Sequence, residues 1–589
     1  MQRHFTTRKP DYSLHSWRVR FLWWVIVVLT AIVIVRLFWL QVVRHSDYQN
    51  LAALQHDIYQ EVLPDRGIIY TQNTRLAEGA ENKYFPVANN QRFYLIYGQT
   101  FAVEDAGKTA EQLNAVLDLP PDVLARIIEQ LSKPNDPYEP LVHRVTEDKI
   151  AALSALALPG IKWEEETLRY YPDKNIGSNI LGFVGWVNDT LVGQYGLEGY
   201  FNKELSGEKG FLRSERDATG RLIGVGEQNF KEALNGTDLY LTIDNSIQAF
   251  ACQTLGDAVT KYDADGGAVI VTNPRTGAVL ALCNNPDYDP NDYSAVENIR
   301  SYTIPAIFDA YEPGSVFKPL TLAAALEEGK ITPETTYEDT GEVKIDGYSI
   351  KNSDLKGHGM VSMVDVLKLS LNTGAIFGMR QIGPAKFADY VRNFGFGELT
   401  GIQLDSEAAG NITPLKKNKE IYAATASFGQ GITVTPLQMV NAYAAIANGG
   451  TLMKPYIVER TVDALGSEYR AVPQEIRRVV SERTATLISG MMVQVVEAGY
   501  GQRAKVPGYY IAGKTGTAQV AEPGSGVYGS RTMHTFVGFG PVSDPQFVML
   551  VRLDHPTAAR FAESTATPAW GQIAKFILNY YQIRPDEVK

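Results

Sequence analysis

The sequence has few of the residues that bind metal ions. It contains eight histidines, none in a His-x-x-His or His-Glu-x-x-His pair, and only two cysteines, Cys252 and Cys283. Protein zinc sites are built from clusters of these residues, so we expect no metal site, and no motif indicates a cofactor. The two cysteines could form a disulfide if the chain is exported. Because no spacing pattern supports a bridge, we expect two single buried thiols.

The sequence also lacks an excess of positive charge. Its 55 lysines and arginines are outnumbered by 66 aspartates and glutamates, which gives a formal net charge of −11. A protein whose main partner is a nucleic acid usually carries the opposite balance, so we expect no nucleic-acid partner. No internal repeat or low-complexity tract is visible. A length of 589 residues with ordinary composition indicates more than one globular domain.

One long apolar run lies near the N-terminus, at residues 21–43. Its length suits a transmembrane helix, which needs about 20 apolar residues. A cleaved signal peptide is disfavoured, because Leu-Phe-Trp-Leu-Gln stands where small residues would be required for cleavage. The residues before the run are mostly basic: Arg3, Arg8, Lys9, Arg18 and Arg20, against Asp11 alone. The positive-inside rule therefore predicts a cytoplasmic tail (1–20), a single membrane span and an extracytoplasmic remainder.

Arg36 lies inside the apolar run, near its outer end. Two explanations of this charge stay open at this point. The guanidinium can snorkel along the helix to the lipid headgroups. Alternatively, it can contact polar groups of another membrane protein.

Residues 44–235 predict a mixed α/β region without a catalytic pattern. Its first part, up to Pro64, is polar and compatible with a helix, and further helices are expected near 109–132 and 146–157. Arg169-Tyr-Tyr-Pro172 and Tyr195-Gly-Leu-Glu-Gly199 lie in segments that we expect to be irregular. No pair of carboxylates and no nucleophile arrangement emerges here. We therefore expect a non-catalytic pedestal domain.

The pattern changes at residue 236 to that of a second domain, 236–583, followed by a polar tail, 584–589. A strand at 238–243 and a helix at 245–262 precede two apolar strands around the turn Pro274–Gly277. The elements expected further on are helices near 363–369, 373–380, 435–448 and 481–498, strands at 508–520, 535–541 and 547–553, and a final helix near 567–582. This order predicts an α+β fold with one antiparallel sheet covered by helices.

Ser-x-x-Lys occurs three times, at Ser206–Lys209, Ser315–Lys318 and Ser353–Lys356. The second differs in its context, because Pro313-Gly314 precedes it and residues 315–329 predict a helix that ends at Gly329. A serine and a lysine three residues apart on a helix share one face, as a nucleophile and its base require. A lysine acts as a base only if burial or a second cation lowers its pKa.

Two further motifs follow Ser315 in the chain. Ser370-Leu-Asn372 is the only Ser-x-Asn, and Lys514-Thr-Gly516 is the only Lys-Thr-Gly. The second motif falls on an expected strand, where a glycine lets another backbone or a ligand come close. Ser-x-x-Lys, Ser-x-Asn and Lys-Thr-Gly in this order form the motif set of penicillin-binding proteins and class A β-lactamases.

With these motifs the chain resembles the class B penicillin-binding proteins, the monofunctional peptidoglycan D,D-transpeptidases, over almost its whole length. Other segments carry the same resemblance: the membrane anchor with Arg36, Arg66-Gly67, Arg169–Pro172, Gly196-Leu-Glu198, Asn285–Asn291, Ser427–Gly431 and Thr435-Pro436. The chain is most similar to the division-specific, FtsI-type branch, and the elongation-specific branch is the alternative. The family fold implied is a pedestal, also called a dimerisation-type domain, joined to a transpeptidase domain like that of the β-lactamases.

The resemblance implies a substrate that ends in D-Ala-D-Ala, the stem peptide of peptidoglycan. Ser315 would be the nucleophile, Lys318 its base, and Ser370 the relay that protonates the leaving amine. Lys514 would be a second cation that keeps Lys318 neutral, and the Asn372 amide would hold the peptide and Lys318.

The same resemblance makes Thr515, Gly516 and Thr517 a substrate-binding strand. The two threonine hydroxyls, backed by Lys514, suit the terminal carboxylate of the peptide, and the strand can bind the peptide edge-on. The oxyanion would lie between the backbone N–H groups of Ser315 and Thr517.

Other functions share some of these features. A class A β-lactamase needs a further glutamate for deacylation, and no Glu-x-x-Leu-Asn stands between Asn372 and Lys514. A β-lactam sensor should carry a cytoplasmic output domain, for which the tail 1–20 is too short. A non-catalytic scaffold has no need of Lys318 or Lys514.

The resemblance finally implies partners and a location. β-Lactam antibiotics would be covalent inhibitors, and a separate SEDS-family glycan polymerase would be a membrane partner in division or elongation. Arg36 and the pedestal are the candidate contacts with that polymerase. The protein is expected in the cytoplasmic membrane, with its catalytic domain on the outer side.

Overall fold

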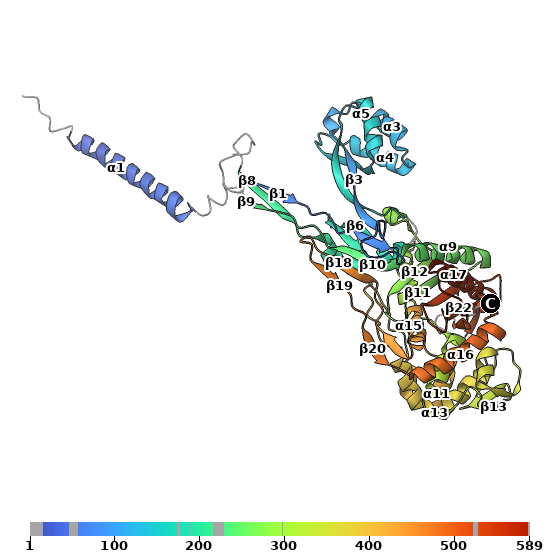
Figure 1. Ribbon diagram of the computed structural model, residues 1–589. Coiled ribbons are helices and arrows are strands. Elements are labelled where there is room, and N and C mark those ends of the chain that lie inside the picture. The colour runs from blue at the N-terminus through green and yellow to red at the C-terminus, as the bar shows by residue number, and fades with distance from the viewer. Residues whose placement is uncertain are drawn as a thin grey trace, which may run out of the picture. The chain divides into compact units, whose positions relative to one another are not determined.

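The computed structural model describes residues 16–45, 57–173, 177–188, 190–215, 229–296, 298–521 and 528–586 (Figure 1). The chain divides into two compact units. The first comprises Met1–Pro64 and Glu208–Leu234, and the second comprises Asp65–Gly207 and Asn235–Lys589. Arg3, Arg8, Lys9 and Asp11, which contribute to the predicted membrane topology, lie outside the described residues.

The first unit contains the apolar helix α1 (Ser16–Phe38), which continues as a π-helical turn over Trp39–Val43. Together they give a segment long and apolar enough to cross a membrane, as the sequence predicts. A small antiparallel sheet of β1 (Asp57–Val62), β8 (Gly210–Glu215) and β9 (Asn229–Lys231) completes the unit. The helix expected up to Pro64 is therefore wrong at 57–62. Pairing with β8, a strand far away in the sequence, overrides the local preference.

A seven-stranded sheet in the second unit joins segments from both sides of residue 236. Its order is β19-β18-β10-β2-β3-β4, and β5 pairs with β3. β10 (Asp238–Asp244) pairs parallel with β2 (Ile69–Gln72) and antiparallel with β18 (Val458–Val462). The two expected domains therefore share one sheet, and the boundary at 235/236 stays a prediction. The other strands are β3 (Tyr84–Gly98), β4 (Glu139–Val145), β5 (Ile161–Tyr170) and β19 (Glu468–Arg470).

Three helices, α3 (Ala106–Leu117), α4 (Pro121–Leu131) and α5 (Glu147–Leu156), share an apolar cluster with β3, β4 and β5. The single helix expected at 109–132 is two helices. Asp118 adopts a left-handed conformation, with φ 56°, and Pro121 begins the next helix. Shorter elements follow in the chain: α6 (Ser178–Leu181), β6 (Phe183–Val187), β7 (Thr190–Gln194), α7 (Gly196–Tyr200) and α8 (Asn202–Ser206).

The centre of the C-terminal part is a five-stranded antiparallel sheet, which confirms the predicted sheet, and its strand order is β12-β11-β23-β22-β21. Every residue of β11 is buried, because both faces of the sheet are covered. Val269 and Val271 belong to one apolar cluster, whereas Ala268 and Ile270 belong to another. The strands are β11 (Gly266–Thr272), β12 (Val279–Asn285), β21 (Ala512–Ala521), β22 (Tyr528–Gly540) and β23 (Phe547–Asp554).

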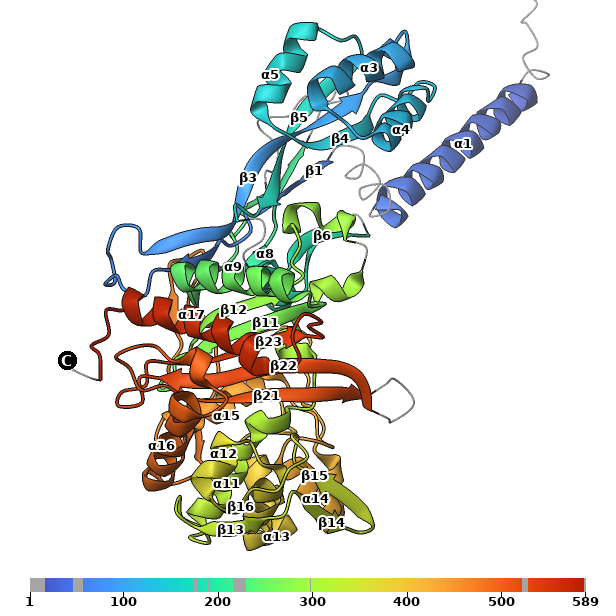
Figure 2. The same cartoon turned by 90° about the vertical axis from the view of Figure 1, so that its right-hand side faces the viewer.

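Helices pack on both faces of this sheet. α9 (Asn245–Tyr262) and α17 (Ala566–Tyr580) belong to one cluster and lie side by side in Figure 2, with the Phe250 and Phe576 rings stacked at 4.2 Å. Helices of the other cluster include α11 (Lys318–Glu327), α12 (Met363–Lys368), α13 (Asn372–Asn393), α14 (Glu420–Ser427), α15 (Pro436–Ala447) and α16 (Glu482–Ala498). α13 is longer than expected, because a kink at Gly383 and Pro384 joins two helical segments.

The two cysteines form a disulfide, so the expectation of single thiols is wrong. Cys252 lies on α9 and Cys283 on β12, and their Cα atoms are 5.2 Å apart. α9 packs on β12 through its buried face. The pairing therefore follows from helix-on-sheet packing, which the spacing of two residues in the sequence does not reveal.

Three of the segments that carry the family resemblance meet at Glu198, a fully buried carboxylate of α7. Arg66 and Arg169 each place a guanidinium nitrogen 2.6 Å from it, and the Tyr171 hydroxyl donates a hydrogen bond at 3.3 Å. Burial raises the pKa of Glu198, but Arg169 and Arg66 outweigh it and leave the pKa below its ordinary value. The segment 195–199 was expected to be irregular, but most of it belongs to the short helix α7 (Gly196–Tyr200), whose Glu198 completes a buried ion-pair cluster.

Removing this carboxylate should destabilise the fold. Glu198→Ala leaves two arginines without their counter-charge, and we expect urea unfolding to report a loss of about 3–5 kcal/mol. Because the folded pKa of Glu198 is lowered, the wild-type advantage is present above the unfolded pKa and is lost as pH falls through the folded pKa. The control is Glu165→Ala, which breaks an exposed pair with Arg92 and should cost at most about 1 kcal/mol. Equal effects of the two substitutions would contradict a central role of Glu198.

Candidate active site

Ser315 lies on a tight 3-10 turn, Gly314–Phe317, that leads directly into α11. Gly314 has a φ of 60°, and its N–H donates to the Gly429 carbonyl at 2.9 Å. A Cβ atom on Gly429 would lie 2.2 Å from the Gly314 oxygen. Glycine is therefore required at Gly429 by close backbone approach. The expected helix at 315–329 thus begins one turn later, at Lys318.

Two contacts that the sequence did not predict support this turn. The hydroxyl of Tyr443, a fully buried residue of α15, donates to the Val316 carbonyl at 2.7 Å. The Thr321 hydroxyl donates to the Ser427 carbonyl at 2.8 Å. A tyrosine in a mostly apolar, alanine-rich helix was the one available signal for Tyr443, because a buried tyrosine hydroxyl usually has a partner.

Lys318 is the first residue of α11 and is completely buried. Its Nζ donates to the Ser370 carbonyl at 2.5 Å and to the Ser370 hydroxyl at 3.2 Å. Burial, reinforced by the positive charge of Lys514, holds the pKa of Lys318 well below the ordinary lysine value. A neutral amine, the form that can accept a proton, is therefore favoured.

Lys514 reaches the same hydroxyl from β21. Its Nζ lies 3.0 Å from the Ser370 Oγ, 3.1 Å from the Thr515 carbonyl and 3.3 Å from the Thr515 hydroxyl. Burial lowers the pKa of Lys514 to about 7. One serine hydroxyl thus lies between two buried lysines, from α11 and from the edge strand of the sheet.

Ser370 is held in an uncommon backbone conformation just after α12. Its φ is 58°, in the left-handed region that favours glycine. The N–H groups of Ser370 and Leu371 donate back to the carbonyls of Leu367 and Val366 and close the end of the helix. A non-glycine residue in such a region costs on the order of 1–3 kcal/mol. Glycine at position 370 would relieve this strain, so the presence of a serine favours a role for its hydroxyl.

The other two Ser-x-x-Lys pairs have different surroundings. The Ser206 hydroxyl accepts a hydrogen bond from Arg66, and Lys209 forms an ion pair with Glu61. Ser353 and Lys356 are both exposed. Ser315 is half-buried, and its hydroxyl has no hydrogen-bond partner within the described part of the chain. Only the Ser315 pair therefore combines an available hydroxyl with a buried lysine.

The predicted binding strand passes directly beside the Ser315 turn. A Cβ atom on Gly516 would lie 3.1 Å from the Pro313 oxygen and 3.0 Å from Val316, so a side chain there would crowd the turn. The Thr517 hydroxyl accepts a hydrogen bond from the Ala562 N–H at 3.0 Å. The Ser315 turn and the Thr517 segment are thus adjacent, as the predicted oxyanion site requires.

Asn372 begins α13, and its Nδ2 donates to the Lys351 carbonyl at 2.8 Å. Across the described ranges, no hydrogen bond joins Asn372 to Lys318, so the predicted contact between them is not present. The predicted role of Asn372 in holding the peptide stays a prediction.

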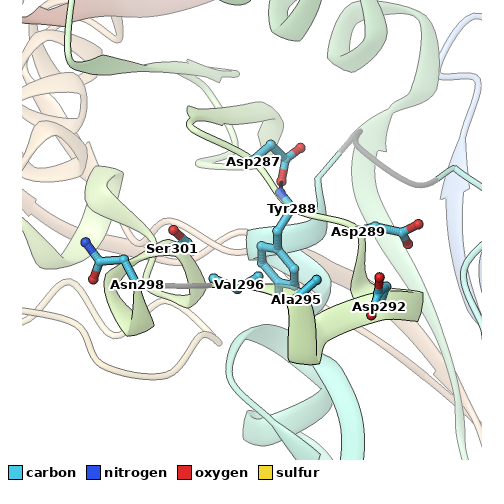
Figure 3. A pocket seen from close by; sticks show the side chains of 8 residues that line it. All are labelled: Asp287, Tyr288, Asp289, Asp292, Ala295, Val296, Asn298 and Ser301. Carbon is cyan, nitrogen blue, oxygen red and sulfur yellow. Dashed lines mark hydrogen bonds between the residues drawn. The ribbon is translucent and has the colours of Figure 1, made fainter. Parts of the chain in front are cut away.

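A pocket of about 410 Å³ lies outside this site, and none of the predicted site residues lines it (Figure 3). It is formed by the Asn285–Asn291 segment and the turns that follow. Asp287, Asp289 and Asp292 line it, and burial raises the pKa of Asp287 to about 7. The same segment is anchored to the pedestal motifs, because the Asn291 amide forms hydrogen bonds with both the N–H and the carbonyl of Tyr171.

Comparison with known proteins gives a consistent result. Residues 267–578 match the penicillin binding protein transpeptidase domain, and residues 61–241 match the penicillin-binding protein dimerisation domain. Stage V sporulation protein D of Bacillus subtilis is 32% identical over 95% of this chain and 85% of its own length. Peptidoglycan D,D-transpeptidase FtsI of Escherichia coli K12 is 30% identical over 97% of this chain and 93% of its own length. The crystal structure of penicillin-binding protein 3 from Mycobacterium tuberculosis with aztreonam is similar to this chain with a TM-score of 0.68. The match covers 90% of this chain and 98% of that structure at 26% sequence identity.

The lowered pKa of Lys318 predicts how the rate of acylation by a penicillin depends on pH and on the residue at position 318. Lys318→Arg should slow acylation about 10²- to 10⁴-fold, nearly as much as Lys318→Ala, since arginine cannot give up its proton. In the wild type, the rate should rise with pH as Lys318 deprotonates, at a pH well below the ordinary lysine pKa of about 10.4, and should fall again as Lys514, with a pKa of about 7, loses its positive charge. Stopped-flow acylation over a pH series measures both effects.

The matched control is Lys368→Arg, because Lys368 is partly exposed and pairs with Asp365 at 2.8 Å. This control should acylate like the wild type. Near-normal acylation by Lys318→Arg would remove Lys318 as the base.

Proposed function

The chain belongs to the penicillin-binding protein transpeptidase family, and from this premise we propose that Ser315 cross-links peptidoglycan stem peptides through an acyl-enzyme during septal wall synthesis. The match of residues 61–241 to the dimerisation domain makes it a class B member. The observation that carries the proposed chemistry is the Ser370 hydroxyl held between the buried amines of Lys318 and Lys514. The FtsI and sporulation relatives support a division-type role.

Acylation follows from the charge states of the two lysines. Neutral Lys318 takes the hydroxyl proton as the Ser315 oxygen attacks the carbonyl that precedes the last D-alanine. The C–N bond then breaks as the Ser370 hydroxyl gives its proton to the departing amine and takes up the proton held by Lys318, which becomes neutral again. Ser370 suits this relay because its hydroxyl lies within 3.2 Å of both lysine nitrogens.

Deacylation runs the same groups in reverse. The amine of a second stem peptide attacks the ester carbonyl, loses a proton to the site and forms the cross-link, while Ser315 regains its proton. The backbone N–H groups of Ser315 and Thr517 would stabilise the oxyanion in both steps. Losing one such donor typically costs about 10²- to 10³-fold in rate.

The substrate's terminal carboxylate would bind at Lys514, Thr515 and Thr517. Lys514 supplies positive charge, which its pKa of about 7 leaves partly present near neutral pH. Gly516 leaves room for the peptide backbone along β21, and Asn372 would hold the peptide from the opposite side.

The membrane arrangement is part of the same proposal. The segment Trp17–Val43 would span the cytoplasmic membrane once, with the N-terminus inside and Ser315 outside, where stem peptides and β-lactams are found. A SEDS-family glycan polymerase would supply nascent glycan, and Arg36 and the pedestal would contact it.

The nucleophile assignment is tested with a fluorescent penicillin on membranes. We expect the wild type to form a long-lived adduct. The amine released when the β-lactam ring opens stays attached to the acyl group, so it does not leave the space that an acceptor would need. Ser315→Ala should lose all labelling, whereas Ser206→Ala and Ser353→Ala should label normally. Rapid loss of the wild-type adduct would indicate a β-lactamase instead. Labelling that vanishes with either control serine would move the nucleophile there.

The role of Arg36 is tested by Arg36→Leu. An arginine in the apolar core costs about 2.5–3.5 kcal/mol on insertion scales, so its retention favours a partner that offsets this cost. We expect normal insertion and penicillin labelling, weaker co-purification of the polymerase in mild detergent, and loss of wall synthesis in cells. Val33→Leu, an apolar exchange on the same helix, should change none of these. Equal polymerase recovery and full complementation would leave snorkelling as the explanation.

A further inference from the structure

The segment between α11 and Ser370 contains a buried carboxylate that the proposed chemistry does not use. Four short strands form this segment: β13 (Thr336–Asp339), β14 (Glu342–Ile345), β15 (Tyr348–Lys351) and β16 (Gly359–Ser362). Asp339, at the end of β13, is 2% exposed. A buried carboxylate is costly unless hydrogen bonds satisfy it, so its partners indicate what it holds.

The partners of Asp339 come from three places in the chain. Asn352 donates from Nδ2 at 2.9 Å, and His358 donates from its backbone N–H at 3.1 Å and lies 2.7 Å away through Nδ1. The Gly341 N–H donates at 3.0 Å. The Thr373 hydroxyl, on the first turn of α13, donates at 2.7 Å. One carboxylate therefore ties the β13–β16 segment to the start of α13.

A second set of contacts joins the same two pieces of chain. Lys351 and Asn352 are consecutive, and so are Asn372 and Thr373. The Lys351 carbonyl accepts from the Asn372 Nδ2 at 2.8 Å, and the Asn352 Oδ1 accepts from the Thr373 N–H at 3.2 Å. We call these four residues the clasp.

The clasp fixes the amide of Asn372 in one orientation. Because a backbone carbonyl can only accept, the Asn372 Nδ2 faces Lys351, and its Oδ1 is turned away from that carbonyl. Ser370, two residues earlier, is the hydroxyl that both lysines contact. A shift of the start of α13 would therefore move the Asn372 amide and the Ser370 hydroxyl together.

We propose that Asp339 is a positioning residue for the Ser370-Leu-Asn372 motif and acts through Asn352 and Thr373. The inference rests on the proposed function, since it assigns these residues to the same acylation step. Within the described part of the chain, Asp339 forms no hydrogen bond or ion pair with either lysine, and its effect passes through the hydroxyl of Thr373 and the amide of Asn352. Orientation matters at this scale, because a misplacement of 1 Å can cost about 10²-fold in rate.

The central test is Thr373→Val against Thr373→Ser in the full-length protein. Valine keeps the side-chain volume but removes the hydroxyl, whereas serine keeps the hydroxyl. With a fluorescent penicillin at saturating concentration, we expect Thr373→Val to acylate about 10- to 100-fold more slowly with full labelling amplitude. Thr373→Ser should restore a rate close to the wild type.

The amplitude of penicillin labelling distinguishes a positioning role of Asp339 and Thr373 from a purely structural one. A structural defect lowers the fraction of protein that labels and leaves the rate constant of the labelled fraction unchanged, whereas a positioning defect lowers the rate constant. Asp339→Asn should behave like Thr373→Val. The matched control is Asp354→Asn, because Asp354 contacts the other nitrogen of His358 at 3.1 Å and lies outside the clasp.

A normal rate constant in Thr373→Val, with or without reduced amplitude, would overturn the inference. So would an equal slowing by Asp354→Asn. If the wild type itself forms no adduct at Ser315, the proposed function fails first, and that result is distinct from either of these.

Discussion

The active site depends on one electrostatic constraint: two lysine side chains are buried within hydrogen-bond distance of a single serine hydroxyl. Taking an ammonium group out of water costs several kcal/mol, and a second cation nearby adds repulsion. Loss of a proton from Lys318 removes both costs, and the neutral amine that results can act as a base. The constraint also explains why the site is assembled from three distant segments. Lys318 lies on α11, Ser370 just after α12 and Lys514 on β21.

Close backbone approach makes this burial possible. The Ser315 turn lies against Gly429, where a side chain would collide with the turn, and against Gly516, where a side chain would crowd it. The strained backbone of Ser370 belongs to the same arrangement, because this left-handed residue just after α12 presents both its carbonyl and its hydroxyl to Lys318.

The sequence predicted the parts of the fold that depend on local periodicity. The central strands are apolar runs and the segment 245–262 has a helical pattern, so both the strands and α9 were recognisable. The elements it missed depend on distant partners. β1 forms because it pairs with β8. The disulfide forms because α9 packs on β12. α7 is stabilised by the ion pairs of Glu198 with Arg66 and Arg169. The site residues were recognisable from their order. Of their supports, the Ser370 carbonyl carries no local signal, and Tyr443 offers only a tyrosine in an alanine-rich helix.

The three Ser-x-x-Lys pairs show why spacing alone does not identify a nucleophile. All three have the same two residue types at the same separation, yet Lys209 pairs with a glutamate and Lys356 is exposed. A lysine that keeps its proton cannot activate a serine, whatever the distance between them. The decisive property is therefore desolvation, which depends on residues far from the motif, such as those of β21 and α15. The order of motifs along the chain is informative because it predicts which segments will bury which lysine.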